Sequence, residues 1–285
     1  MTPSPACHDA PVTETAERYD RIAAGYDQWW APVLAPSAVA LLERFDAVVA
    51  GGARELRDVG VGTGNLSIAA LSHWPSVRVT GIDASREMIG AVKALVEERA
   101  SAARDRFQGR VAFAAELPFE DRRFDAAMSS FVLQLVPSRP AALREIRRVL
   151  RPGGLFAHVT WLTDDRPFTP DRIFDRMLDE YGFEDDEGPD RKGDIPSADR
   201  AAGELRRAGF RDVVADRRIL EHTFTVDGYI SFLTEFDEQS LFDEMGRAER
   251  RRFLQEFRER LTGLRPDELT FRVPIVYASG RRSNG

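Results

Sequence analysis

Three glycines at alternate positions follow a short apolar segment, and they are the residues of this chain best suited to holding a ligand. They stand in the stretch Leu56-Arg57-Asp58-Val59-Gly60-Val61-Gly62-Thr63-Gly64-Asn65-Leu66, which has the pattern of a strand, a turn and the start of a helix. Glycine lets the backbone approach a bound molecule without a Cβ in the way, and the free N–H groups at a helix start face the same molecule. The spacing therefore indicates a ligand-binding turn, although a plain tight turn between strand and helix would look the same.

An acid stands at the end of the next apolar segment, Val77-Arg78-Val79-Thr80-Gly81-Ile82-Asp83. This segment has the pattern of a second strand, and Asp83 lies nineteen positions after Gly64. An acid about that far beyond a glycine turn is placed to accept hydrogen bonds from ribose hydroxyls. The two features together favour a ligand that carries a ribose.

The glycine spacing is G-x-G-x-G, because no glycine stands where the dinucleotide pattern G-x-G-x-x-G needs its third one. Asp58 lies two residues before the first glycine. The stretches Leu117–Asp125 and Glu145–Gly154 read L-P-F…F-D and E-x-x-R-V-L-x-P-G-G. These motifs, in this order over about residues 18 to 162, resemble the class I S-adenosylmethionine-dependent methyltransferases. The last two motifs resemble those of the branch of this family that includes the quinone-biosynthesis methyltransferases and many other small-molecule methyltransferases.

The resemblance implies S-adenosyl-L-methionine as the cofactor. A segment similar to Y-D-x-I-A…Y-D folds over the methionine end of the cofactor in this branch, which implies a lid containing Tyr19 and Tyr26. From spacing alone, core packing of these tyrosines is the alternative. Residues just after the second acid touch the adenine in the family, although Met88 could equally fill the core. The residues implied to bind the cofactor are Tyr19, Tyr26, Asp58, Gly60, Gly62, Gly64, Asp83, Ala84, Met88, Ala115, Glu116, Leu117, Ser129 and Phe131.

The chain departs from the family pattern just before L-P-F, where an aspartate commonly accepts a hydrogen bond from the adenine amino group. Here the sequence is Phe113-Ala114-Ala115-Glu116-Leu117. Either Glu116 reaches the amino group, or backbone groups of Ala114 and Ala115 hold the ring. Losing one neutral hydrogen bond costs only about 0.5–1.5 kcal/mol, so the departure does not exclude cofactor binding.

Large aromatic residues gather in the segment that ends at Trp30, which indicates that it covers something apolar. We expect the methyl acceptor to be a small molecule bound by Trp30, Trp161, Tyr229 and Phe232. No catalytic residue can be assigned from the sequence. His222 and the lid tyrosines are better placed than His158 to act as a base, and we expect His158 to pack in the core. No metal site is expected, because the acids of the run over residues 184–190 lack the spacing of a calcium loop.

The composition limits the classes of protein that this chain can belong to. Of its 285 residues 43% are hydrophobic, enough for a large core, and its net charge is −7 at pH 7. Such a charge provides no global basic field for nucleic acid, so no nucleic-acid partner is expected. The single cysteine, Cys7, allows no internal disulfide, and no apolar run approaches eighteen residues. Residues 1–12 have no signal-peptide pattern, and a cytoplasmic protein without a membrane span is expected.

The elements predicted by the pattern give an α/β, doubly wound, mostly parallel seven-stranded Rossmann-like sheet with a helical cap. We expect a tail and helical lid over residues 1–45, a cofactor-binding core over 46–165, and cap helices among the last strands over 166–285. Helices are predicted over residues 38–50, after two prolines that end the lid, and over 229–241 and 250–264. A third strand is predicted over 110–114 and a last strand over 271–278.

These observations favour methyl transfer from S-adenosylmethionine to a small acceptor at O, N or C. A sulfonium methyl is already activated, so holding acceptor and methyl in line can supply roughly 7–11 kcal/mol and a base is not essential. A nucleotide-dependent oxidoreductase is the first alternative, and the glycine spacing argues against it. A non-enzymatic protein that binds S-adenosylmethionine or S-adenosylhomocysteine is the second. The oligomeric state cannot be read from the sequence.

Overall fold

A seven-stranded sheet forms the centre of the protein, whose computed structural model describes residues 14–183 and 193–284. The strand order is β3-β2-β1-β4-β5-β7-β6, and β7 runs antiparallel to both of its neighbours. The seven strands and the mostly parallel sheet confirm the predicted fold class. The strands are β1 Glu55–Val59, β2 Arg78–Asp83, β3 Phe107–Val111, β4 Phe124–Ser130, β5 Leu150–Trp161, β6 Phe210–Thr223 and β7 Thr270–Arg282.

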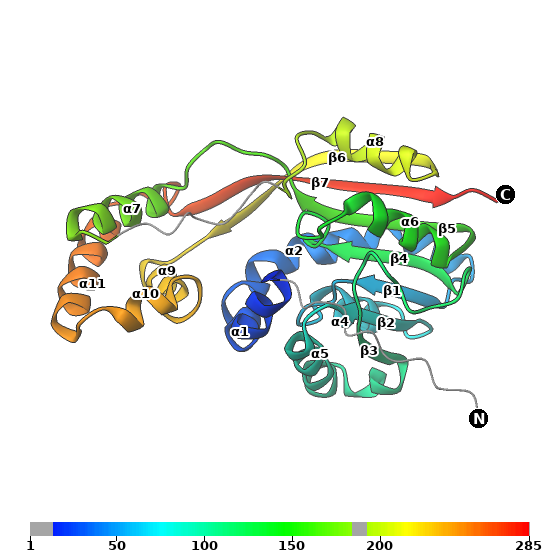
Figure 1. Cartoon of the computed structure of the whole chain (residues 1–285), viewed down its shortest axis with the longest axis horizontal. Helices are drawn as coiled ribbons and strands as arrows, with labels where there is room; N and C mark the ends of the chain where they lie inside the picture. The colour runs from blue at the N-terminus through cyan, green and yellow to red at the C-terminus, as the bar shows by residue number, and fades with distance from the viewer. Residues whose placement is uncertain (1–13, 184–192, 285) are drawn as a thin grey trace, which may run out of the picture.

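Helices cover both faces of the sheet (Figure 1). The helices α2, α4 and α5 bury one face, and α6 and α8 bury the other. Within residues 14–183 and 193–284, no helix is both long and apolar enough to cross a membrane. The helical elements of the first half are α1 Glu14–Trp29, α2 Ala31–Leu41, η1 Leu42–Arg44, α3 Asp46–Ala50, α4 Asn65–His73, α5 Arg86–Arg99, η2 Ser101–Arg106 and α6 Arg139–Val149. Those of the second half are α7 Thr169–Tyr181, α8 Ala198–Arg207, α9 Val226–Phe232, a π-helical turn Leu233–Asp237, α10 Gln239–Glu244 and α11 Arg247–Thr262.

Besides small differences at the ends of other elements, three predicted elements differ from those observed in a way that affects the lid, the site or the cap. The helix predicted over 38–50 is three helical pieces, and the prolines that were to end the lid instead lie within α2, with Pro32 in its first turn. Proline suits that position, because the first N–H groups of a helix have no intrahelical partner. The third strand begins and ends three residues earlier than predicted. The helix predicted over 229–241 is interrupted by the π-helical turn between α9 and α10.

The last two strands leave the sheet together and form a long antiparallel ribbon (Figure 1). Pairing between β6 and β7 continues from Phe210 with Arg282 as far as Thr223 with Thr270. The far part of this ribbon carries a helical lobe made of α7, α9, the π-helical turn Leu233–Asp237, α10 and α11. Buried aromatic side chains from these helices, among them Phe174, Phe253 and Phe257, form its core. We call this part the distal lobe.

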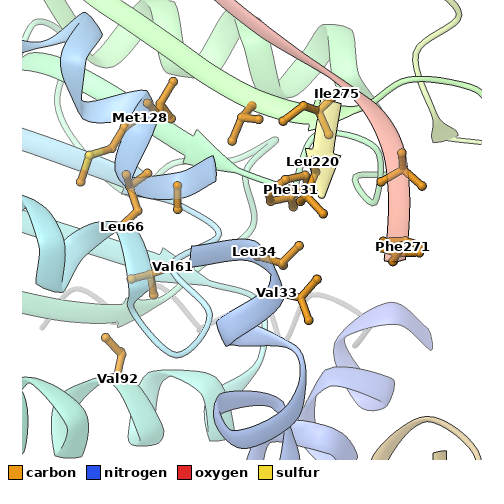
Figure 2. Close-up of a cluster of buried hydrophobic side chains, with 14 of the residues drawn as sticks. Val33, Leu34, Val61, Leu66, Val92, Met128, Phe131, Leu220, Phe271 and Ile275 are labelled. Carbon is orange, nitrogen blue, oxygen red and sulfur yellow. The ribbon is translucent and has the colours of Figure 1, made fainter. Parts of the chain in front are cut away.

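A continuous apolar cluster joins the sheet to α2 and to the near part of the ribbon. Figure 2 shows part of this cluster, with Val92 of α5, Val61 and Leu66 beside the glycine turn, and Leu34 of α2. Phe131 and Phe271 continue the cluster toward the ribbon. The glycine turn therefore packs against apolar side chains of this cluster, which fix its position.

Candidate functional site

A hollow lies at the carboxyl ends of β1, β2 and β4, with α1 over it. Ligands of open parallel sheets gather at these ends of the strands. Nine of the fourteen residues implied to bind the cofactor line this hollow, namely Tyr19, Tyr26, Asp58, Gly60, Gly62, Gly64, Asp83, Ala84 and Phe131. The structure thus brings together residues from four separate parts of the chain.

The three glycines of the turn have different surroundings. A Cβ on Gly60 would stand 2.2 Å from Val132, and one on Gly64 would stand 2.5 Å from Val92. A Cβ on Gly62 would meet nothing within 4 Å, and its φ of +52° is a conformation that glycine adopts most easily. Gly60 and Gly64 therefore allow close packing, whereas Gly62 borders open space in the hollow.

The Asp83 carboxylate is held by two backbone N–H groups. Gly62 donates to Oδ2 at 2.9 Å and Ser85 donates to Oδ1 at 3.0 Å. Burial raises the pKa of Asp83, and these hydrogen bonds lower it. The acid at the end of β2 is thus fixed to the glycine turn and has lone pairs left for a ligand.

Asp58 lines the same hollow and has one buried carboxylate oxygen without a hydrogen-bond partner. Its side chain is 1% exposed, and Oδ2 accepts a hydrogen bond from Ser67 at 2.7 Å. Oδ1 has no partner. Burial raises the pKa of Asp58 to about 7, and Ser67 opposes that rise. A buried acceptor without a partner costs about 1–3 kcal/mol, so a donor on a ligand would be stabilising here.

Tyr19 and Tyr26 lie two turns apart on α1, with ring centroids 6.0 Å from each other. The helix continues through Gly25, which keeps both rings on the side of the hollow. Burial raises the pKa of Tyr19 to about 12 and that of Tyr26 well above its ordinary value. Both phenols are neutral near pH 7, which argues against either one acting as a base.

Five residues expected at the cofactor do not line the hollow, and their places require a correction. Ala115, Glu116 and Leu117 lie beyond it, because β3 ends at Val111 and the residues that face the hollow are 112–114. Met88, in the first turn of α5, is fully buried in the core. Ser129 is fully buried and donates to the Val59 carbonyl at 2.8 Å.

Other residues reach the hollow without having been recognised in the sequence. They carry no distinctive pattern, since most are small or apolar and take their place only through the fold. Thr15 and Ala16 could have been found as neighbours of Tyr19 on the same helix face. The unrecognised lining residues are Thr15, Ala16, Leu34, Val61, Thr63, Asn65, Leu66, Ile82, Ala112, Phe113, Ser130, Val132, Leu135 and Pro137. Ala114, one of the two residues whose backbone was the alternative for holding the adenine ring, also lines the hollow.

An aromatic cluster begins at Phe131, at the edge of the hollow. The ring of Trp161 lies 4.4 Å from that of Phe131, and Trp30 contacts both Trp161 and Phe232, at 6.3 and 5.6 Å between centroids. Phe271 of the ribbon closes the group at 6.1 Å from Trp30. Three of the four residues expected to bind the acceptor are therefore packed together beside the hollow, although none lines it.

Tyr229, the fourth residue expected at the acceptor, lies farther into the distal lobe. Its side chain is fully buried, and its hydroxyl donates to Asp171. Burial, together with the charge of Asp171, raises its pKa well above the ordinary value. Tyr229 stacks against Phe232 within the lobe. Its position therefore does not favour the expected contact with the acceptor.

Neither histidine discussed from the sequence reaches the hollow. His158 is buried and stacked on Phe156 at 5.5 Å, and burial lowers its pKa to about 3. The expectation that it packs in the core is confirmed. His222 lies on the ribbon against Phe224, away from the hollow, which argues against its use as a base there. Across the described ranges no group of three metal-ligating side chains occurs, and the acidic run at 184–190 lies outside them.

Comparisons with known proteins bear on the family and the fold of this chain. The family described as a methyltransferase domain matches residues 57–158. The ubiquinone/menaquinone biosynthesis C-methyltransferase UbiE of Geobacter sp. (strain M21) is 33% identical over 172 residues, which are 57% of this chain and 72% of that protein. The demethylmenaquinone methyltransferase of Staphylococcus aureus (strain JH9) is 37% identical over 125 residues, 44% of this chain and 48% of that protein.

Similar solved structures share the fold across nearly the whole chain. The [4+2]-cyclase SpnF aligns with a TM-score of 0.57 at 19% identity, over 88% of this chain and 82% of that one. Phosphoethanolamine N-methyltransferase 2 of Haemonchus contortus, solved with S-adenosyl-L-methionine, aligns with a TM-score of 0.57 at 17% identity, over 96% and 61%. At these identities the likeness concerns the fold alone.

Proposed function

Because the chain belongs to the class I S-adenosylmethionine-dependent methyltransferases of the quinone-biosynthesis type, we propose that the hollow at the ends of β1, β2 and β4 binds S-adenosylmethionine. The enzyme transfers a methyl group from this cofactor to a small-molecule acceptor. The observation that carries the site assignment is the convergence of the glycine turn, Asp83, Asp58 and α1 on one hollow.

The donor and acceptor groups of the hollow fit the parts of the cofactor. Asp83, which two backbone N–H groups hold in place, would accept hydrogen bonds from the ribose hydroxyls. The unpaired Oδ1 of Asp58 would accept a hydrogen bond from the ammonium group of the methionine part. Residues 112–114 would border the adenine, and the open space beside Gly62 leaves room for the cofactor backbone.

The cofactor supplies a methyl group on a positively charged sulfur, which leaves as a neutral thioether. The protein then has to hold the acceptor in line with that methyl, which can contribute roughly 7–11 kcal/mol without a base. The side chains of Tyr19 and Tyr26 close one side of the hollow and remain neutral near pH 7. Their rings would exclude water from the reacting groups.

The acceptor we propose is a flat, largely apolar ring of the hydroquinone type, methylated at carbon. The S–CH3 bond breaks as a C–CH3 bond forms on the ring, and the hydrogen on that ring carbon then leaves as a proton to solvent. Support comes from the aromatic cluster of Phe131, Trp161, Trp30, Phe232 and Phe271, which begins at the edge of the hollow. The names of the relatives, a quinone-biosynthesis C-methyltransferase and a demethylmenaquinone methyltransferase, agree with such an acceptor. The cluster is closed in this structure, so the acceptor would enter by parting Trp30 and Phe232.

Two measurements test this proposal. Calorimetry with S-adenosylhomocysteine and, in parallel, NADH should detect binding of the first alone. Incubation with methyl-labelled S-adenosylmethionine and a series of hydroquinones and catechols should give a labelled product with the label on a ring carbon. Binding without transfer to any member of the series would overturn the acceptor class while leaving the cofactor site standing.

A further inference from the structure

Two aspartates fasten the lid helix α1 to α5. Asp20 and Asp27 lie seven residues apart, and each follows one of the two tyrosines that line the hollow. Both side chains contact α5 or the turn before it. The position of the tyrosines over the hollow therefore depends on the contacts that these two carboxylates make with α5 and the turn before it.

Asp20 completes the start of α5 from another helix. Its Oδ1 accepts a hydrogen bond from Ser85 Oγ at 2.5 Å and one from the Glu87 N–H at 3.2 Å. Ser85 is the N-cap of α5, and its own hydroxyl oxygen accepts from the Met88 N–H at 3.0 Å. The first N–H groups of a helix lack intrahelical partners, and a negative charge beside them is favourable.

The same serine also holds the acid at the end of β2, since the Ser85 N–H donates to Asp83 at 3.0 Å. Ser85 is fully buried with α1 docked, so its hydroxyl would lose its carboxylate partner if Asp20 were replaced by alanine in the docked state. A buried donor left unsatisfied costs about 1–3 kcal/mol. Asp20 therefore ties the lid directly to the turn that carries Asp83.

Asp27 makes a different contact two turns later. It forms a two-bond pair with the Arg99 guanidinium, with N–O distances of 3.0 and 2.5 Å. Arg99 is 44% exposed, and exposed pairs of this kind contribute about 0–1 kcal/mol. Asp27 thus offers a matched control on the same helix, with the same residue type and a contact that solvent screens.

We propose that Asp20 is a positioning residue for methyl transfer, because its carboxylate latches α1 onto Ser85 and holds Tyr19 over the cofactor. The inference rests on the proposed function of the hollow. A cofactor that binds only when the lid is docked has an apparent Kd equal to its intrinsic Kd divided by the docked fraction. Loss of the latch therefore weakens binding even though Asp20 does not line the hollow.

Trypsin cleavage tests the latch without any ligand. Arg18 and Arg21 are exposed on α1, and cleavage there requires the helix to open locally. Cleavage after these residues, followed by mass spectrometry on the full chain, should be about tenfold faster in Asp20→Ala than in Asp27→Ala. Equal rates in the two variants would overturn the latch, whatever the ligand affinity.

Calorimetry with S-adenosylhomocysteine gives the second readout. Asp20→Ala should raise Kd about tenfold, and Asp27→Ala by less than about fivefold. Asp20→Asn should recover most of the affinity, because an amide oxygen accepts the same two hydrogen bonds. A purely structural role would give a lower thermal midpoint with unchanged Kd, which would overturn the proposal. If the unchanged protein does not bind S-adenosylhomocysteine, the proposed function fails instead, and the trypsin comparison still decides the latch.

Discussion

At the scale of single residues, the glycine turn and the acids beside it were recognisable in the sequence because their chemistry depends on residue type. Gly62 has a positive φ, which glycine adopts most easily, and Asp58 supplies a carboxylate oxygen without a partner. The sequence could not separate the three glycines, since their roles come from neighbours such as Val132 and Val92 that lie far along the chain. The structure makes Gly62 the informative position.

The first prediction therefore concerns Gly62→Val. The new side chain would meet no protein atom near its Cβ and would project into the hollow, so it should block S-adenosylhomocysteine. The positive φ adds strain of order 1–3 kcal/mol, which leaves the fold intact in a domain of ordinary stability. Circular dichroism should give a native spectrum while calorimetry detects no binding. A folded variant with unchanged affinity would contradict the site. Gly60→Val should instead destabilise the fold, because its side chain meets Val132.

The second prediction is a dependence of cofactor affinity on pH. Asp58 has a pKa near 7 in the free protein, and an ammonium group of the cofactor would bind its ionised form. Binding below pH 7 must therefore release a proton, so affinity should rise up to tenfold per pH unit from pH 5 to 7 and then level off. Calorimetry across this range checks it, and Asp58→Asn should give a flat profile. A flat profile in the unchanged protein would contradict the assignment.

The same pKa has a consequence for stability. The folded protein binds the Asp58 proton more tightly than the unfolded chain, whose aspartate pKa is about 3.9. Protonated Asp58 therefore contributes stability that is fully present below about pH 4 and is lost as the pH rises through 7. Relative to Asp58→Asn, the free energy of unfolding should fall across this window.

At the scale of elements, the buried parallel strands were predictable because each reads as a short apolar run that ends in a turn or an acid. The lid helix was also predictable, and it continues through Gly25. The end of β3 was not, since residues 107–114 have no sharp stop signal and register depends on pairing with β2. This three-residue shift explains why residues 112–114, rather than 115–117, face the hollow.

That shift gives the third prediction. Ala114 lines the hollow, whereas Glu116 is exposed beyond it. A large side chain in Ala114→Phe would occupy the space proposed for adenine, so Kd for S-adenosylhomocysteine should rise at least about tenfold, or 1.4 kcal/mol. Glu116→Ala should leave Kd unchanged. Calorimetry on both variants decides the question, since a loss confined to Glu116→Ala would restore the contact expected from the family pattern.

At the scale of the whole molecule, the sequence indicated that helices among the last strands would cover the site, but it gave no sign of a separate lobe. The distal lobe stands on the β6–β7 ribbon, and long-range pairing of this kind leaves no local motif (Figure 1). Its contact with the rest of the chain includes Phe236 against Tyr26 and Phe232 against Trp30. The lobe thus touches the lid and the aromatic cluster, while the glycine turn and both acids belong to the sheet.

This division predicts that a destabilising substitution in the distal lobe impairs methyl transfer to the acceptor without impairing binding of the cofactor. Phe257 is fully buried in α11 and contacts Phe174, Phe253 and Tyr229. Phe257→Ala should lower the free energy of unfolding by about 3–5 kcal/mol, because it leaves a cavity in the lobe. Tyr229 stacks on Phe232 of the aromatic cluster, so loss of packing around Tyr229 should lower the rate of methyl transfer. The Kd for S-adenosylhomocysteine should stay within about threefold of that of the unchanged protein.

The neighbouring Arg258→Ala is the matched control for this prediction. Arg258 is exposed on α11 and pairs with Asp227, a contact that contributes about 0–1 kcal/mol. It should therefore leave unfolding, binding and transfer nearly unchanged. The measurements are chemical unfolding, calorimetry and transfer of a labelled methyl group, all on the full chain. If Phe257→Ala weakens cofactor binding as strongly as transfer, the two sites are not separable, and the distal lobe must help hold the lid over the cofactor as well as the acceptor.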